Sequence, residues 1–145
     1  LLWMLVDSVS KGGNLLLNVG PTGRGEFDER ALATLQAIGK WTRVNGRSIY
    51  GCTASDYTPP PDCRYTQNGN RLYLHVMAWP LRHLHLKGIA DRIEYAQFLH
   101  DASEIKIFQN TFDHSIETDN TVVLEIPIQK PNVEIPVIEI FLKDR

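Results

Sequence analysis

The sequence predicts two parts, an αβα segment that closes an α/β domain and, after it, an all-β antiparallel sandwich. Three observations support this prediction. The first fifty residues show helical spacing interrupted by a short apolar run, and a Thr-, Ser- and Pro-rich stretch follows. Beyond that stretch, apolar residues recur with a period of two, which is typical of strands that bury one face.

The first part is expected to be helix, strand and helix. Apolar residues recur at helical spacing from Leu1 to Val9, and Lys11, Gly12 and Gly13 then provide a helix end. Asn14–Val19 is a nearly continuous apolar run, typical of a parallel strand covered on both faces. A second helix is expected from residue 27 to 45. Because the chain begins inside an apolar helix without a cap, we expect residues upstream of Leu1.

The second part is expected to contain about six short strands. Residues 53–63 include three consecutive prolines and are typical of a stiff connector. Asn68 and Gly69 favour a hairpin turn just before the alternating stretch 71–78. The further strands are expected at 84–87, 92–98, 104–109, 121–127 and 137–143.

Composition and charge exclude two classes of partner. Fifteen Lys and Arg residues against seventeen Asp and Glu residues give a net charge of -2, so no positive surplus indicates nucleic acid or an anionic membrane. Every apolar run is shorter than the roughly 20 residues that span a bilayer. We therefore expect neither a nucleic-acid nor a membrane partner.

Two groups of residues have both a chemical and a structural interpretation. Cys52 and Cys63 flank the proline run and would form a disulfide only in an oxidising compartment, so two unpaired thiols are the favoured interpretation. His75, His83 and His85 lie close in sequence, but no nearby Cys or acid completes a set of metal ligands. We therefore expect no metal site.

Several motifs resemble one family of glycosidases. Residues 5–22 (LVDSVSKGGNLLLNVGPT) closely resemble the segment around the last barrel strand of the α-L-fucosidases of glycoside hydrolase family 29. The similarity continues through 39–41 (GKW), 44–46 (VNG) and 48–51 (SIYG), and 72–74 (LYL) with 78–80 (AWP) resembles the first hairpin of that family's C-terminal sandwich. The resemblance implies that residues 1–52 are the end of a (β/α)8 catalytic barrel, 53–63 a connector and 64–145 the sandwich domain.

The resemblance also implies a reaction. The family hydrolyses terminal α-L-fucosyl linkages with retention, using an aspartate nucleophile and a glutamate acid/base, without a cofactor. Both carboxylates are expected upstream of Leu1, since Asp7 lies in the middle of the first helix. The chain alone is therefore expected to be inactive, and the partner of the complete enzyme to be a fucosylated oligosaccharide or glycoconjugate.

Four residues are candidates for the site. Barrel active sites lie at the C-terminal ends of the strands, so we expect Asn18 to contact the substrate pocket or to support the residues that line it. Its alternative role is to hold the strand end through its amide. Thr22, Arg24 and Glu26 follow in the next loop and are expected at the pocket rim, with an ordinary solvated loop as the alternative.

Two other classes of function compete with a glycosidase. The chain is alternatively a non-catalytic carbohydrate-binding β-sandwich module, although such a module has no use for a buried parallel strand at 14–19. A scaffold or docking domain would instead expose an apolar patch. If the strand at 14–19 lacks its barrel neighbours, its open apolar edge predicts self-association of the fragment.

Overall fold

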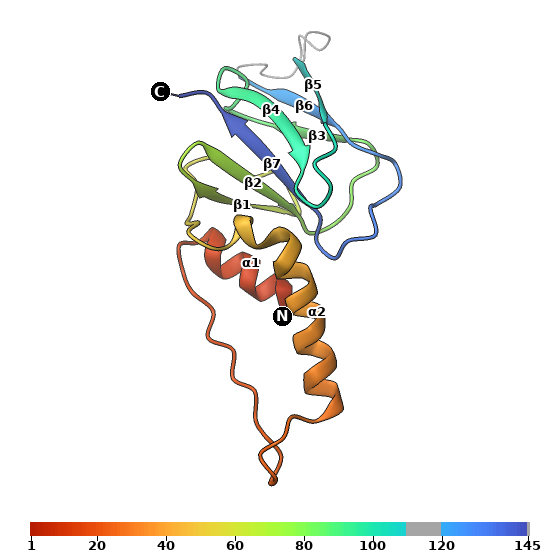
Figure 1. Cartoon of the computed structure of the whole chain (residues 1–145). Coiled ribbons are helices and arrows are strands. Elements are labelled where there is room, and N and C mark those ends of the chain that lie inside the picture. Colours follow the sequence, from red (N-terminus) through yellow and green to blue (C-terminus); the bar gives the residue numbers. More distant parts are fainter. Residues whose placement is uncertain (110–119, 145) are drawn as a thin grey trace.

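The computed structural model describes residues 1–109 and 120–144, which form a helical layer and two antiparallel sheets (Figure 1). The helices are α1 (Leu2–Ser10) and α2 (Glu29–Asn45), and a short 3-10 turn, η1 (Gly46–Ser48), follows α2 directly. The strands are β1 (Cys63–Asn68), β2 (Arg71–Val76), β3 (His83–Leu86), β4 (Ile93–Phe98), β5 (Lys106–Gln109), β6 (Val122–Glu125) and β7 (Val137–Leu142). No helix in the described ranges has the length and apolar character needed to cross a bilayer.

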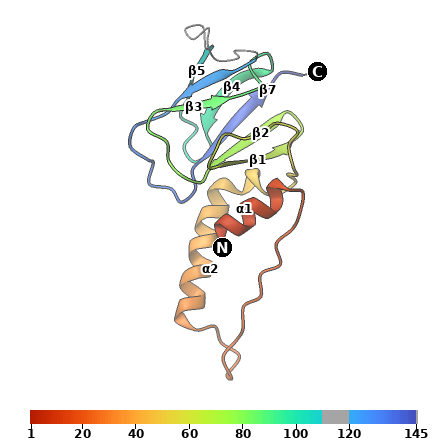
Figure 2. The ribbon, with the colours of Figure 1, turned by 180° about the vertical axis from the view of Figure 1, so that it is seen from behind.

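The two sheets form the sandwich that the period of two predicted. One sheet has the order β1-β2-β7-β4 and the other β3-β6-β5, and all neighbouring strands are antiparallel. Leu72 and Leu74 of β2 and Ile138 and Ile140 of β7 are fully buried in the core between the sheets, together with residues such as Leu86 of β3. The hairpin turn expected at Asn68 and Gly69 joins β1 to β2. Seen from behind, the three-stranded sheet lies in front of the four-stranded one (Figure 2).

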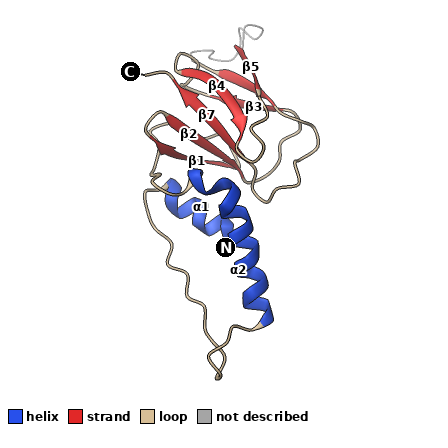
Figure 3. Ribbon diagram, in the orientation of Figure 1, coloured by secondary structure: helices blue, strands red, loops and turns tan. Residues whose placement is uncertain are grey.

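The helices cover the other face of the four-stranded sheet (Figure 3). Strand side chains alternate, so Tyr73 and Val137 point away from the first core and join Val6 and Trp41 in a second apolar cluster. The Trp41 indole Nε1 also donates a hydrogen bond to the backbone oxygen of Glu134, at 2.8 Å. The central strands of this sheet are therefore buried on both faces.

An ion pair fixes α1 to the edge of the sheet. The Asp7 carboxylate accepts hydrogen bonds from Lys11 Nζ at 2.6 Å and from Arg64 Nε of β1 at 2.8 Å. These bonds hold the pKa of Asp7 below its usual value. Asp7 is therefore a structural anion that joins α1 to the first strand.

A buried polar chain joins η1 to the sheet. The Thr66 hydroxyl donates to the Ser48 carbonyl at 2.6 Å and lies 2.9 Å from His75 Nε2. Because that hydroxyl proton is already used, Nε2 of His75 must carry the proton that joins them. His75 is fully buried, and burial lowers its pKa to about 3.

The strand expected at Asn14–Val19 is not formed, which corrects one element of the predicted fold. The segment is extended, and Leu16 is 88% exposed. A strand requires hydrogen bonds to a neighbour, and none of the described strands pairs with this segment. The helices on either side form as predicted, and Asp28 caps α2 by accepting the Ala31 backbone N–H at 2.7 Å.

The region around 53–63 also differs from the expectation of a simple connector. Strand β1 begins at Cys63 and was not predicted, because its alternation includes the buried polar residue Thr66. Thr53 pairs with Gln67 of the same strand. Cys52 and Cys63 are both free thiols.

His75 predicts that acid destabilises the fold. Its pKa is about 3 in the folded chain against an ordinary value near 6.5, so the unfolded chain takes up a proton first as the pH falls. The contribution of the neutral, buried His75 to the free energy of unfolding is complete above pH ~6.5. Below that pH it decreases by about 1.4 kcal/mol per pH unit, which amounts to about 2 kcal/mol at pH 5. Urea unfolding at pH 7.5 and pH 5 measures this loss.

The matched variant is His75→Gln, whose amide keeps a donor for Thr66 but does not titrate. We expect its free energy of unfolding to depend much less on pH over the same range. An equally steep dependence in parent and variant would exclude His75 as the cause.

Candidate functional site

All four candidate residues lie on one segment, the arm, which we define as residues 11–28 between α1 and α2. The arm extends away from the helices to a tip remote from the sheets (Figure 1). Its residues are mostly exposed in this chain. The side chains of the arm are therefore accessible to any group that lies beside α1 and α2.

Asn18 lies on the inner side of the arm, where it borders a shallow hollow of about 370 Å³. The hollow is also lined by Leu17 and Val19 of the arm and by Asp28, Arg30 and Ala31 at the start of α2. Among the described residues the Asn18 amide has no hydrogen-bond partner, and the residue is exposed. Its amide is therefore available to a group outside this chain.

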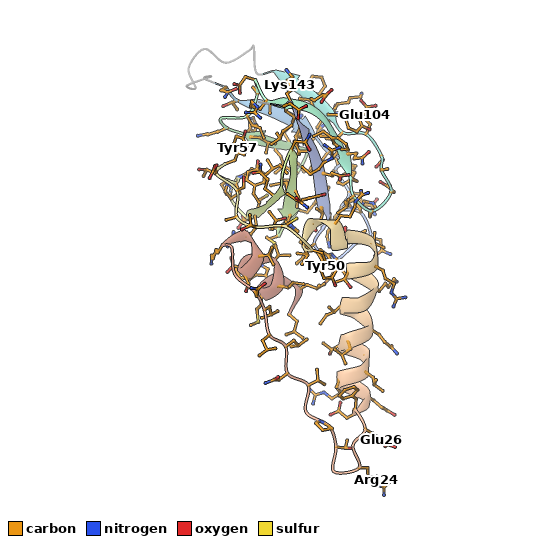
Figure 4. The ribbon with its side chains drawn as sticks, turned by 60° about the vertical axis from the view of Figure 1, so that its left-hand side comes forward. Arg24, Glu26, Tyr50, Tyr57, Glu104 and Lys143 are labelled. Carbon is orange, nitrogen blue, oxygen red and sulfur yellow. The ribbon has the colours of Figure 1, made fainter. Side chains whose placement is uncertain are left out.

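The tip of the arm is a self-contained turn. The Thr22 backbone N–H donates to the Glu26 oxygen at 2.7 Å, and the Glu26 N–H donates back to the Thr22 hydroxyl at 3.3 Å. Gly25 closes the turn with a backbone bond to Thr22 and a φ of 80°. Arg24 and Glu26 project from the tip (Figure 4). The turn brings Thr22 and Glu26 together and leaves Arg24 outside.

The more enclosed carboxylates serve the fold. Glu139 accepts hydrogen bonds from Arg47, Tyr73 and Gln97, and Glu125 is paired with Arg82. The hydrogen bond from Arg82 lowers the pKa of Glu125. A carboxylate held ionised by a cation is a poor general acid, because it gives up its proton below neutral pH.

The histidines do not gather into a metal site in the part of the chain that is described. His83 and His85 are exposed on β3, whereas His75 is inside the fold. No group of three His, Cys, Asp or Glu residues in the described ranges is placed to hold a metal ion.

Exposed apolar side chains on α1, the arm and α2, which we call the open face, were not predicted as a group from the sequence. Several large members are between 38% and 88% exposed, namely Leu1, Trp3, Met4, Leu16, Leu17, Phe27 and Leu32. The apolar run at 14–19 in the sequence indicated one part of the open face. An apolar face of this extent is typical of a surface that contacts further protein.

Comparison with known proteins agrees with the resemblance found in the sequence. The family model described as alpha-L-fucosidase matches residues 1–47. The alpha-L-fucosidase of Branchiostoma floridae is 39% identical over 84 residues, covering 53% of this chain and 18% of that protein. The tissue alpha-L-fucosidase of Mus musculus is 52% identical over 83 residues, covering 52% of this chain and 18% of that protein.

The fold of nearly the whole chain is found in solved structures. Alpha-L-fucosidase isoenzyme 1 from Paenibacillus thiaminolyticus has a TM-score of 0.85 at 37% identity, over 96% of this chain and 33% of that one. A GH29 alpha-L-fucosidase from Bacteroides thetaiotaomicron, trapped as a covalent intermediate, has a TM-score of 0.80 at 28% identity, over 96% of this chain and 31% of that one.

The chain thus spans about a fifth of the curated relatives it matches and about a third of these solved structures. The sequence match includes α1, the arm and α2, and the structural match extends it over the sandwich. These matches support a GH29 α-L-fucosidase, of which this chain corresponds to one portion.

Proposed function

We propose that this chain is the C-terminal part of a retaining exo-α-L-fucosidase whose catalytic carboxylates come from residues upstream of Leu1. The observation that carries the proposal is the match of 96% of the chain to a solved α-L-fucosidase, at a TM-score of 0.85 and 37% identity. The substrate is then a fucosylated oligosaccharide or glycoconjugate. No cofactor is needed for this reaction.

A retaining mechanism is supported by chemistry seen in a relative. The Bacteroides enzyme was trapped as a covalent intermediate with a fluorinated fucosyl fluoride. A covalent glycosyl-enzyme forms when an enzyme nucleophile, in most glycosidases a carboxylate, attacks the sugar, and its hydrolysis then restores the original configuration. Asp7 and Glu125 are engaged in ion pairs within the fold, which is consistent with an upstream origin for the catalytic pair.

The order of helix, extended apolar segment and helix supports a barrel end for residues 1–52. Between α1 and α2 the arm has the composition of a parallel strand, and its apolar side chains form part of the open face. Neighbouring barrel strands would hydrogen-bond this segment on both sides and cover that face. We assign residues 53–63 to the connector and 64–145 to the sandwich domain.

In this arrangement Asn18 lies near the mouth of the barrel. The arm then occupies the place of the eighth strand, whose C-terminal end borders the active site. Asn18 contacts the pocket or supports the residues that line it, and Thr22, Arg24 and Glu26 lie at the rim. The unpartnered, exposed amide of Asn18 is the feature that favours this role.

The proposed reaction has a direct test. The complete protein should release fucose from 4-nitrophenyl α-L-fucoside, and proton NMR of the first product should show the α-anomer. The 145-residue chain should show no turnover above a buffer blank, because a retaining glycosidase needs both carboxylates. An inverted first product, or real turnover by the short chain, would contradict the proposal.

The role of Asn18 is tested by Asn18→Ala in the complete protein. Losing one buried hydrogen bond costs about 1 to 3 kcal/mol, so kcat/KM should fall about tenfold or more. Asn132→Ala is the matched control, since Asn132 is an exposed amide outside the arm and should leave the kinetics unchanged. Normal kinetics in Asn18→Ala at an unchanged melting temperature would exclude the pocket role.

The open face predicts that the isolated chain self-associates. Leu16 is 88% and Leu17 38% exposed, and exposed apolar surface of this kind drives association. Light scattering should find dimers or larger species, and Leu16→Ser with Leu17→Ser should shift them towards monomer. Ile128→Ser is the control, because Ile128 is 64% exposed but lies outside the open face. A monomeric parent chain would refute this prediction.

A further inference from the structure

A groove without an assigned role lies where α2 meets the sandwich. It measures about 700 Å³ and runs between the last turns of α2, with η1, and the turn that joins β4 to β5. Its lining includes Arg43, Gly46, Arg47, Tyr50, Asp101 and Ala102. Tyr50 lies at the sandwich end of α2, while the arm tip with Arg24 lies at the opposite end (Figure 4).

The Tyr50 ring is exposed to solvent and is held in place by its contact with Gly46. Tyr50 is 70% exposed. A Cβ atom added to Gly46 would lie 3.0 Å from Cε2 and 3.1 Å from Cδ2 of this ring, so the ring edge rests directly on the glycine. The Tyr50 backbone N–H also donates to the Gly46 oxygen at 2.8 Å. A ring held in this way loses little freedom when a ligand packs on it.

The polar groups beside the ring are fixed as well. Arg47 uses Nη2 to donate to Glu139 at 3.0 Å, yet 64% of its side chain is exposed, so its other N–H groups are available. On the opposite wall Asp101 Oδ1 accepts the Ser103 N–H at 3.0 Å and its hydroxyl at 2.6 Å. The second carboxylate oxygen lies 3.5 Å from His100 Nε2 and completes a rigid turn.

The charges of the groove favour a neutral ligand. The Arg47 charge is balanced by Glu139, and the lining contains one further cation, Arg43, and one anion, Asp101. An anionic ligand would gain no net attraction here. A flat aromatic ring beside guanidinium donors and a carboxylate acceptor suits a pyranose, whose C–H face packs on the ring while its hydroxyls bond to the walls.

We propose that this groove binds a neutral saccharide unit, with Tyr50 as the stacking platform and Arg47 and Asp101 as hydrogen-bonding walls. Identifying that unit as part of the glycan that carries the fucose rests on the function proposed above. The binding itself depends only on residues of this chain.

Surface plasmon resonance on the immobilised 145-residue chain tests the proposal, with lactose and 2′-fucosyllactose as probes. We expect both sugars to bind with a Kd on the order of 1 mM, weak as befits an open groove. Tyr50→Ala should weaken both at least tenfold. Gly46→Ala should weaken them less than Tyr50→Ala does, because the added methyl group shifts the ring edge by only a few tenths of an ångström. Circular dichroism melting verifies that each variant folds.

Phe108→Ala is the control, since Phe108 is a 48% exposed aromatic on β5 and does not line the groove. Absence of saccharide binding, equal binding by parent and Tyr50→Ala, or an equal loss in Phe108→Ala would each overturn the inference. So would self-association that Tyr50→Ala abolishes, because the groove would then be a protein interface. Hydrolysis by the complete protein is scored separately, so an inactive complete protein with intact sugar binding would overturn the proposed function alone.

Discussion

The rest of the structure depends on the burial of the four-stranded sheet on both of its faces. Strands β2 and β7 place one set of apolar side chains against the second sheet and another, including Tyr73 and Val137, against the helices. Glu139 lies on the helix side, where it is 4% exposed and is neutralised by Arg47 just after α2. Without the helical layer Tyr73 and Val137 would face water, and Glu139 would lose its bond to Arg47. Helices and sandwich are therefore held as one structure.

Local patterns predicted most of the fold because they record which face of an element is buried. Alternation along β2 and the helical spacing in the first fifty residues led to the correct strand and helices at nearly the correct bounds. The pattern was less informative for β1, where Thr66 is buried by its bond to Ser48 and not by apolar character. Asn14–Val19 shows the opposite failure, because its residues are typical of a strand but a strand exists only with a partner to pair with.

The candidate site was harder to predict than the fold, for a physical reason. In the proposed enzyme the barrel pocket would be assembled from the ends of several strands, and this chain would supply one of them, so the other residues around Asn18 would come from elsewhere in the protein. Tyr50 was noted only as part of the family resemblance at 48–51, since an aromatic residue after a helix is typical of ordinary surface. Only its contact with Gly46, together with the fixed Arg47 and Asp101, distinguishes it.

The position of α2 links the two parts of the proposed enzyme. One side of the helix is anchored in the sandwich through Trp41 and its bond to the Glu134 backbone, while Leu32 on the same helix belongs to the open face. The arm ends where α2 begins, so whatever fixes α2 also fixes the end of the arm. In the proposed enzyme the sandwich would hold the last barrel helix, and through it the arm with Asn18, in a defined position. The sandwich, which would supply no catalytic residue, would then affect the reaction by holding the arm in position, because reacting groups must be held closely to be effective.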